Sequence, residues 1–203
     1  EMSRSFATPL VRSSATLGGN IVAGAPVADA VVPLLTLDAS LTLQASGDRQ
    51  WSQSLASFMA TRSQSGALVT QVNVPVPAKD AFWFYYKLAH RRSGAVSIAS
   101  TALVITREGQ HIKEASIALG AITPAPLRAT RAEAVLLNEV LPLREQVIER
   151  CLVNLVADLQ GPRDDLWASS TYRVRMGQAL VKKALKQLNL CIYKDHEEIK
   201  EEL

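Results

Sequence analysis

The stretch ATLGGNI (residues 15–21), followed by PVAD (residues 26–29), is the part of the chain whose pattern decides both its fold and its chemistry. Two adjacent glycines lack Cβ atoms, so the backbone there can approach a bulky ligand closely. Successive exposed N–H groups in such a turn form a concave donor site for phosphate oxygens. Thr16 and Asn20 flank the glycines with side chains that can donate to the same oxygens.

Asp29 follows Asn20 by nine residues and is a candidate acceptor for a sugar hydroxyl, the role of acidic residues in other dinucleotide sites. Taken alone, Gly-Gly-Asn is more often an ordinary turn, so a turn and a phosphate site both remain open at this point. A nicotinamide-binding Rossmann domain is disfavoured, because no Gly-x-Gly-x-x-Gly follows an expected parallel strand.

The composition is that of an ordinary globular protein. The chain has 203 residues, enough for one large or two small domains, with 48% hydrophobic and 20% charged residues. Its net charge of +3, from 22 basic and 19 acidic residues, is too balanced to indicate nucleic-acid binding. The apolar runs are far shorter than the ~20 residues of a membrane span. The first residues, EMSRS, carry no apolar signal segment, so we expect no membrane partner.

Two cysteines, Cys151 and Cys191, stand far apart in the sequence. They give neither a disulfide framework nor the spacing of metal ligands, so we expect no metal site in this chain. A reducing cytoplasm is therefore the expected compartment. An iron–sulfur centre needs a cluster of cysteines, so any such centre must lie on another chain.

The first part of the chain is expected to form strands after an irregular start. Residues 1–27 are rich in Ser, Gly and Ala and contain Pro9 and Pro26, which predicts a loop. Asp29 is expected to be the N-cap of a short helix that extends to Leu37. Alternation of apolar and polar residues predicts a strand over residues 39–44, with 49–53 as its hairpin partner and a helical segment over 54–60. An apolar run ended by prolines predicts a strand over 66–74, and an aromatic run predicts one over 82–88. A turn at residues 107–110 predicts a hairpin of strands 97–106 and 112–121.

Helical periodicity replaces this alternation near Ile122. Thr130 and Glu133 have the spacing of a capping box, which predicts a short helix to Leu137. Apolar residues three and four positions apart predict helices over residues 143–159 and 170–188, with a helical extension beyond. Strands first and helices later predict an α+β fold, in which helices cover one face of an antiparallel sheet.

Four motifs, in the same order, resemble the FAD-binding (medium) subunits of the molybdenum hydroxylase family, which includes the xanthine dehydrogenase, carbon monoxide dehydrogenase and aldehyde oxidoreductase types. They are the loop at residues 11–39, KLAHRRSGAV (87–96), IALGAITPAPLRA (117–129) and DLWASSTYR (165–173). The resemblance implies that residues 1–90 are the second part of a molybdopterin-dehydrogenase-type FAD-binding domain. Residues 91–203 would be a carbon monoxide dehydrogenase flavoprotein C-terminal-like domain, with an antiparallel sheet packed against three helices.

The resemblance also implies roles for single residues. The loop would line the diphosphate and ribityl part of FAD, and an apolar pair would pack against the flavin. Lys87 matches the family residue near the polar edge of the ring, where a cation favours a reduced, anionic flavin. The alternative for Lys87 is a solvated strand end. The implied cofactor-binding residues are Ala15, Thr16, Gly18, Gly19, Asn20, Val22, Ala28, Asp29, Leu68, Val69 and Lys87, of which Lys87 also takes the catalytic role.

Partners follow from the same resemblance. Substrate would be oxidised at a molybdopterin centre on a large subunit, and electrons would pass through [2Fe-2S] clusters on a small subunit to FAD and then to NAD⁺ or another acceptor. Family members begin with another lobe that carries a first glycine-rich loop. We therefore expect this chain to hold half of the cofactor cleft, as a fragment, a split subunit or a degenerate member. The alternative is a scaffold whose C-terminal helices dock a partner after FAD binding was lost.

Overall fold

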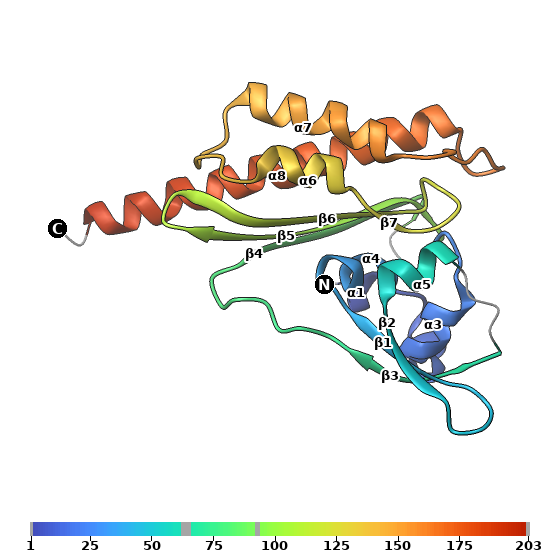
Figure 1. Cartoon of the computed structure of the whole chain (residues 1–203). Helices are drawn as coiled ribbons and strands as arrows, with labels where there is room; N and C mark the ends of the chain where they lie inside the picture. Colours follow the sequence, from blue (N-terminus) through green and yellow to red (C-terminus); the bar gives the residue numbers. More distant parts are fainter. Residues whose placement is uncertain (1, 62–65, 92–93, 202–203) are drawn as a thin grey trace.

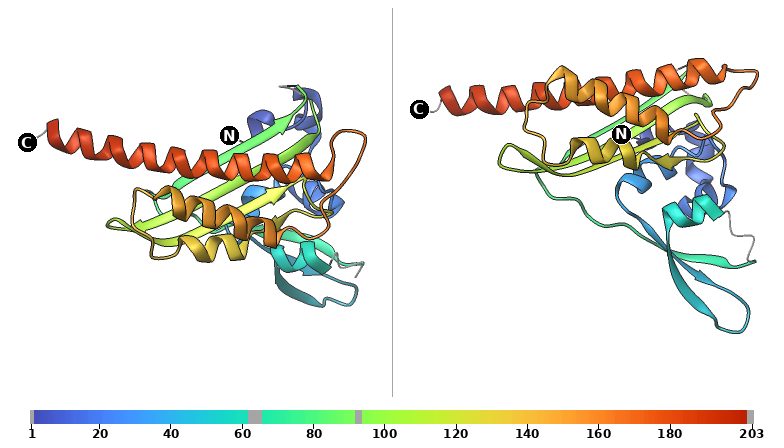
Figure 2. Two further views of the ribbon diagram at one scale, coloured as in Figure 1. Left: turned by 90° about the horizontal axis from the view of Figure 1, so that it is seen from above. Right: turned by 45° about the horizontal axis from the view of Figure 1, so that its top comes forward.

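The computed structural model describes residues 2–61, 66–91 and 94–201, with side chains as far as Tyr193. A four-stranded antiparallel sheet forms the middle of three layers (Figure 1). Helices lie on one of its faces and an N-terminal lobe lies on the other, and Figure 2 shows the same layers from two further directions. The strands, in their order across the sheet, are β4 (Phe82–Ala89), β5 (Ser97–Glu108), β6 (His111–Gly120) and β7 (Leu127–Arg128).

Alternation along β5 and β6 gives this sheet two buried faces. Leu103 pairs with Ile117, and both are fully buried in the core below the helices. The neighbouring pair, Ala102 and Ala118, is buried in the second core, which belongs to the N-terminal lobe. Helices α6–α8 cover one face, as expected, and the N-terminal lobe covers the other, where small residues let it approach. At Gly120 an added Cβ would come within 2.5 Å of a Val32 methyl group.

The helical layer agrees with its sequence pattern. It consists of α6 (Thr130–Leu136), α7 (Glu145–Asp158) and α8 (Ser170–Glu201), so the expected extension of the last helix is confirmed. Val147, Ile148, Cys151, Leu152 and Leu155 of α7 are buried in the core, as their spacing predicts, and α7 packs on α6 and α8. The prediction that Thr130 and Glu133 form a capping box was wrong. The Glu133 carboxylate accepts from Ile117 N and Arg128 Nε, and the Asp158 carboxylate accepts from the first amides of α6.

The N-terminal lobe combines a three-stranded antiparallel sheet, ordered β2-β1-β3, with short helices. A core that includes Leu41, Leu43 and Leu55 joins this sheet to the helices and to the larger sheet. Its elements are α1 (Met2–Ser5), α2 (Pro9–Ser14), α3 (Leu17–Ala23), α4 (Val31–Thr36), β1 (Ser40–Gln44), β2 (Gln50–Ser54), α5 (Leu55–Thr61) and β3 (Leu68–Asn73).

The prediction of a loop over residues 1–27 was wrong, because three short helices occupy this stretch. Thr8 caps the amide of Val11, and Pro9 occupies the first turn of α2, where a missing N–H costs nothing. The prediction that Asp29 is the N-cap of the helix was wrong. The N-cap of α4 is Ala30, which has no side-chain cap, and the Asp29 carboxylate points elsewhere. In the three described ranges, no helix combines the length and apolar character needed to cross a bilayer.

Candidate functional site

The paired glycines lie in the first turn of α3 and not in a left-handed turn. Thr16 is the N-cap, with φ −112° and ψ 151°, and its hydroxyl oxygen accepts from Gly19 N at 3.0 Å. Its carbonyl oxygen accepts from Asn20 N at 3.1 Å. Gly24, at φ +57°, ends the helix in the left-handed conformation that favours glycine. The cap therefore fixes α3 with its N-terminal amides facing outward.

Two of these amides stay available to a ligand. Within the described part of the chain, the N–H groups of Leu17 and Gly18 donate to no acceptor. A helix N-terminus carries partial positive charge, so these donors suit an anionic oxygen. At Gly19 an added Cβ would come within 2.9 Å of Thr16 Oγ1, so the cap requires this glycine. At Gly18 an added Cβ would meet nothing within 4 Å, so packing within this chain does not explain that glycine.

A helical glycine costs roughly 0.5–1 kcal/mol relative to alanine, so Gly18 is explained best by a group that approaches the backbone from outside. Donors aimed outward and open space at Cα fit the diphosphate of FAD. Other loop residues surround this place. Ala15 is exposed just before the Thr16 cap, and Val22 is 58% exposed on α3. Ala28 is buried, so any contact through its side chain would need the lobe to open.

One of the two polar groups of the Asn20 side chain already has a hydrogen-bond partner. Its Oδ1 accepts from Ala30 N at 3.2 Å, which ties α3 to the segment before α4. Its amide nitrogen remains a donor. The adjacent Asp29 is 5% exposed, so the sugar-acceptor role expected for it would require a ligand to enter the interior of the lobe.

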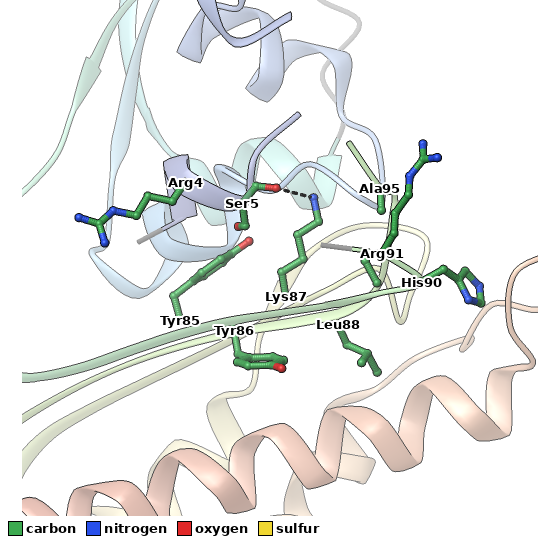
Figure 3. Close-up of a pocket in the computed structure, with 10 residues that line it drawn as sticks. Arg4, Ser5, Tyr85, Tyr86, Lys87, Leu88, His90, Arg91 and Ala95 are labelled. Atoms are coloured by element: carbon green, nitrogen blue, oxygen red, sulfur yellow. Dashed lines mark hydrogen bonds between the residues drawn. The ribbon is translucent and has the colours of Figure 1, made fainter. Parts of the chain in front are cut away.

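Lys87 and Asp29 form a buried ion pair between the sheet and the lobe. Lys87 Nζ lies 2.5 Å from Asp29 Oδ2, and the two side chains are 7% and 6% exposed. Ser97 Oγ donates to the other carboxylate oxygen at 2.7 Å, and Lys87 Nζ also donates to the Ser5 carbonyl at 3.3 Å (Figure 3). The alternative of a solvated strand end for Lys87 was wrong. Sequence reasoning missed Ser97, since no spacing rule connects residues 29, 87 and 97.

A cleft of about 490 Å³ opens beside this ion pair. It lies between α1 and the end of β4, and Arg4, His90 and Arg91 give it a basic border (Figure 3). Tyr85 lines it with a buried hydroxyl that has no hydrogen-bond partner of normal geometry among the described residues. Burial, and then the charge of Asp29, raise the pKa of Tyr85 well above its ordinary value, so the phenol stays a donor. The next motif residues, Arg92 and Ser93, lie outside the described residues.

Leu68 and Val69 lie on β3, the strand against which α3 packs. Successive strand residues point to opposite faces, so the two side chains do not form one apolar surface. Leu68 is 69% exposed, whereas Val69 is half-buried against the lobe core. The expected residues therefore fall into two neighbourhoods. The first is α3 with β3, and the second is Asp29 with Lys87; the contact from Ala30 to Asn20 connects them.

Comparison with known proteins finds two family domains along the chain. The family model described as the FAD binding domain in molybdopterin dehydrogenase matches residues 1–77, and the model of the CO dehydrogenase flavoprotein C-terminal domain matches residues 84–188. The glyceraldehyde dehydrogenase medium chain of Sulfolobus acidocaldarius is 30% identical over 88% of this chain and 63% of its own length. The carbon monoxide dehydrogenase medium chain of Hydrogenophaga pseudoflava is 26% identical over 91% of this chain and 64% of its own.

A solved structure repeats the likeness in three dimensions. The carbon monoxide dehydrogenase of Hydrogenophaga pseudoflava that lacks the Mo-pyranopterin moiety of its cofactor has a TM-score of 0.82 and 26% identity, over 90% of this chain and 63% of that chain. Fold and matched domains together define a flavoprotein subunit of α+β class. The chain belongs to the FAD-binding (medium) subunits of the molybdenum hydroxylase family. It spans about 63% of the length of the glyceraldehyde dehydrogenase medium chain.

Proposed function

We propose that this chain is the FAD-binding, electron-transferring subunit, or part of one, of a molybdenum-dependent oxidoreductase. Electrons would come from [2Fe-2S] clusters on a small partner chain, which a large molybdopterin chain reduces, and would leave to NAD⁺ or another acceptor. The observation that carries this proposal is the pair of free amides at Leu17 and Gly18 beside open space at Gly18. The two separate cysteines support a cytoplasmic location.

The residues of α3 would hold the diphosphate. The free amides of Leu17 and Gly18 would supply donors, the Asn20 side-chain nitrogen would supply another from the same helix, and Thr16 keeps the helix end in position. The small residues allow close approach of the backbone, and the apolar residues cover the less polar parts of the cofactor. The small residues are Ala15, Gly18, Gly19 and the buried Ala28, and the apolar residues are the exposed Val22 and Leu68 and the half-buried Val69.

The cleft beside Lys87 would take the ring of the flavin, which supplies one- and two-electron transfer chemistry when bound. The Lys87 stem lines this cleft, and its ammonium group is turned to Asp29. A carboxylate 2.5 Å away offsets most of the field of the cation, so the pair affects a bound ring less than a free lysine would. The Tyr85 hydroxyl group, which has no hydrogen-bond partner of normal geometry among the described residues, could donate to a bound ring. We divide the chain at residues 90 and 91 into the two proposed domains.

FAD titration of the purified chain tests this proposal. We expect quenching of flavin fluorescence and yellow absorption bands that stay with the protein on gel filtration. Gly18→Val fills the open space, so it should weaken FAD binding at least about tenfold without loss of folding, a change near 1.4 kcal/mol. Ala23→Val, at the exposed end of the same helix, is the matched control and should bind like the wild type.

Two results would contradict the proposal. One is a wild-type chain, purified with its partner chains, that holds no flavin. The other is a Gly18→Val variant that binds FAD with unchanged affinity. A stable complex with partner chains that contains no FAD would favour the scaffold alternative.

A further inference from the structure

The position of helix α3, which contains Gly18 and Gly19, depends on few contacts. Helix α3 has seven residues, far fewer than an isolated helix needs for stability in water. Only one of its side chains, Ile21, is buried. Its N-terminal amides can therefore be held toward a ligand only if other groups fix the helix against the rest of the fold.

We infer that Ser97 and Asp29 are positioning residues that fix α3 and its amide donors against the large sheet. The inference rests on the proposed function, since those donors are the ones assigned to the diphosphate. It gives Asp29 a role different from direct contact with the cofactor, and it gives Ser97 a role in the site for the first time.

The contacts form a continuous path from the sheet to the helix. Ser97 begins β5 and donates to Asp29 Oδ1 at 2.7 Å, while Lys87 on β4 binds Oδ2. The amide of the next residue, Ala30, donates to Asn20 Oδ1 at 3.2 Å. Asn20 lies in α3, one residue after the two glycines. A shift of the Asp29 backbone is therefore passed to Asn20 within one residue.

Both oxygens of the Asp29 carboxylate already have partners from the sheet, and the group is buried. A buried charge without a partner is strongly unfavourable, so the carboxylate stays where Lys87 and Ser97 hold it. Other polar contacts also join the lobe to the sheet domain. Ala121 N donates to Pro26 O at 2.8 Å, and Lys87 Nζ donates to Ser5 O at 3.3 Å. Arg128 donates to Leu35 O and binds Asp38, beyond the far end of α4. These contacts remain when the Ser97 hydroxyl is removed. Its loss should therefore act on α3 through Asp29 and Asn20, and should leave α4, most of whose side chains are buried, in place.

Hydrogen–deuterium exchange, followed by mass spectrometry without FAD, tests the inference. Ser97→Ala should raise exchange of the hydrogen-bonded amides over residues 19–24 by roughly 5- to 10-fold, the effect of one lost hydrogen bond, and leave α7 unchanged. Ser100→Ala is the matched control, since Ser100 is equally buried on β5 and makes no hydrogen bond to Asp29 among the described residues. Ser97→Thr keeps the hydroxyl and should restore slow exchange.

Asp29→Asn leaves Lys87 buried without a counter-ion and is expected to fold poorly, so the double variant Asp29→Asn/Lys87→Met removes the charge as well. It should show the same fast exchange in α3. A second readout is FAD affinity, which Ser97→Ala should lower by a similar factor while Ser100→Ala does not.

Slow exchange of α3 in both Ser97→Ala and the double variant would overturn the inference, whatever FAD does. Equal acceleration in α3 and α7 would also overturn it, because it would show general destabilisation. Failure of the wild type to bind FAD removes the proposed function, and the exchange data still decide the positioning role.

Discussion

The two faces of the β4–β7 sheet are held by different kinds of contact. On the helical face, a single large core of leucine, isoleucine and valine side chains joins the sheet to α6, α7 and α8. On the lobe face the core is smaller, and a buried ion pair, Lys87 with Asp29, supplements it. Apolar burial is non-directional, whereas an ion pair needs defined geometry. The helical face therefore supplies the stability of the fold, and the lobe face sets the position of the ligand-binding helix.

The helical face also contains buried polar groups, and removal of Arg173 should have the largest effect. Arg173 is 1% exposed and donates to Ile98 O, Ala121 O and both oxygens of Asp165. Arg173→Met leaves these acceptors without a donor, so we expect a loss of about 3–5 kcal/mol of unfolding free energy in urea denaturation. Arg175→Met, on the exposed side of the same helix, should change it by less than about 0.5 kcal/mol. Equal effects of the two variants would show that Arg173 is not an anchor.

Truncation of one leucine in each core would compare how the two faces of the sheet are stabilised. Leu103 is fully buried on the helical face and Leu43 is 1% exposed in the lobe core. Each change to alanine should cost about 2–5 kcal/mol. Hydrogen exchange should separate them, because Leu103→Ala should accelerate exchange throughout both layers and Leu43→Ala chiefly in β1–β3. If Leu43→Ala also accelerates α7, the two cores unfold as one unit.

Low pH should weaken the helical face first. Burial opposes ionisation of Asp165, but hydrogen bonds from Arg173 and from the amides of Trp167 and Ala168 outweigh it and lower the pKa from 3.8 to about 2. Because the folded pKa lies below the unfolded one, the stabilisation is fully present above the unfolded pKa and is lost as pH falls through the folded pKa. Urea denaturation at about pH 4.5 and about pH 2.5 should show a larger loss for the wild type than for Asp165→Asn. Parallel losses would contradict the assignment.

Thiol reactivity gives the smallest expected effect. Burial, followed by the charges of Asp158 and Glu133, raises the pKa of Cys151 to about 12, while Cys191 is exposed. A disulfide reagent at neutral pH should therefore modify one thiol in the native protein and two in the denatured protein. Rapid modification of both thiols in the native state would mean that the helical layer opens readily.

Most of the structure on the helical face could be predicted from the sequence. The apolar residues of α7 recur at helical spacing, and the strands β5 and β6 show a clear hairpin pattern, so periodicity was sufficient for both. Glu133 was misassigned, because capping-box spacing says nothing about Arg128, which competes for its carboxylate. The division at residues 90 and 91 stays a prediction.

The lobe face was predicted less well. The Ser- and Gly-rich start contains three short helices with a weak apolar pattern. Two of them, α2 and α3, begin at threonine caps, and α2 also has a first-turn proline; these are local features that hydrophobic periodicity does not show. Gly18 and Gly19 were identified as special, but their helical conformation was not. The contact of Ser97 with Asp29 joins residues 68 positions apart, and only the folded chain brings them together.

Chemical-shift mapping with FAD tests the central claim most directly. In ¹H–¹⁵N correlation spectra of the labelled chain, we expect FAD to shift the amide signals of Leu17 and Gly18 most, because these free donors would meet the diphosphate. ADP should shift the same signals, since it carries the same diphosphate. Saturable FAD shifts that leave Leu17 and Gly18 unchanged, or no shifts at all, would contradict it.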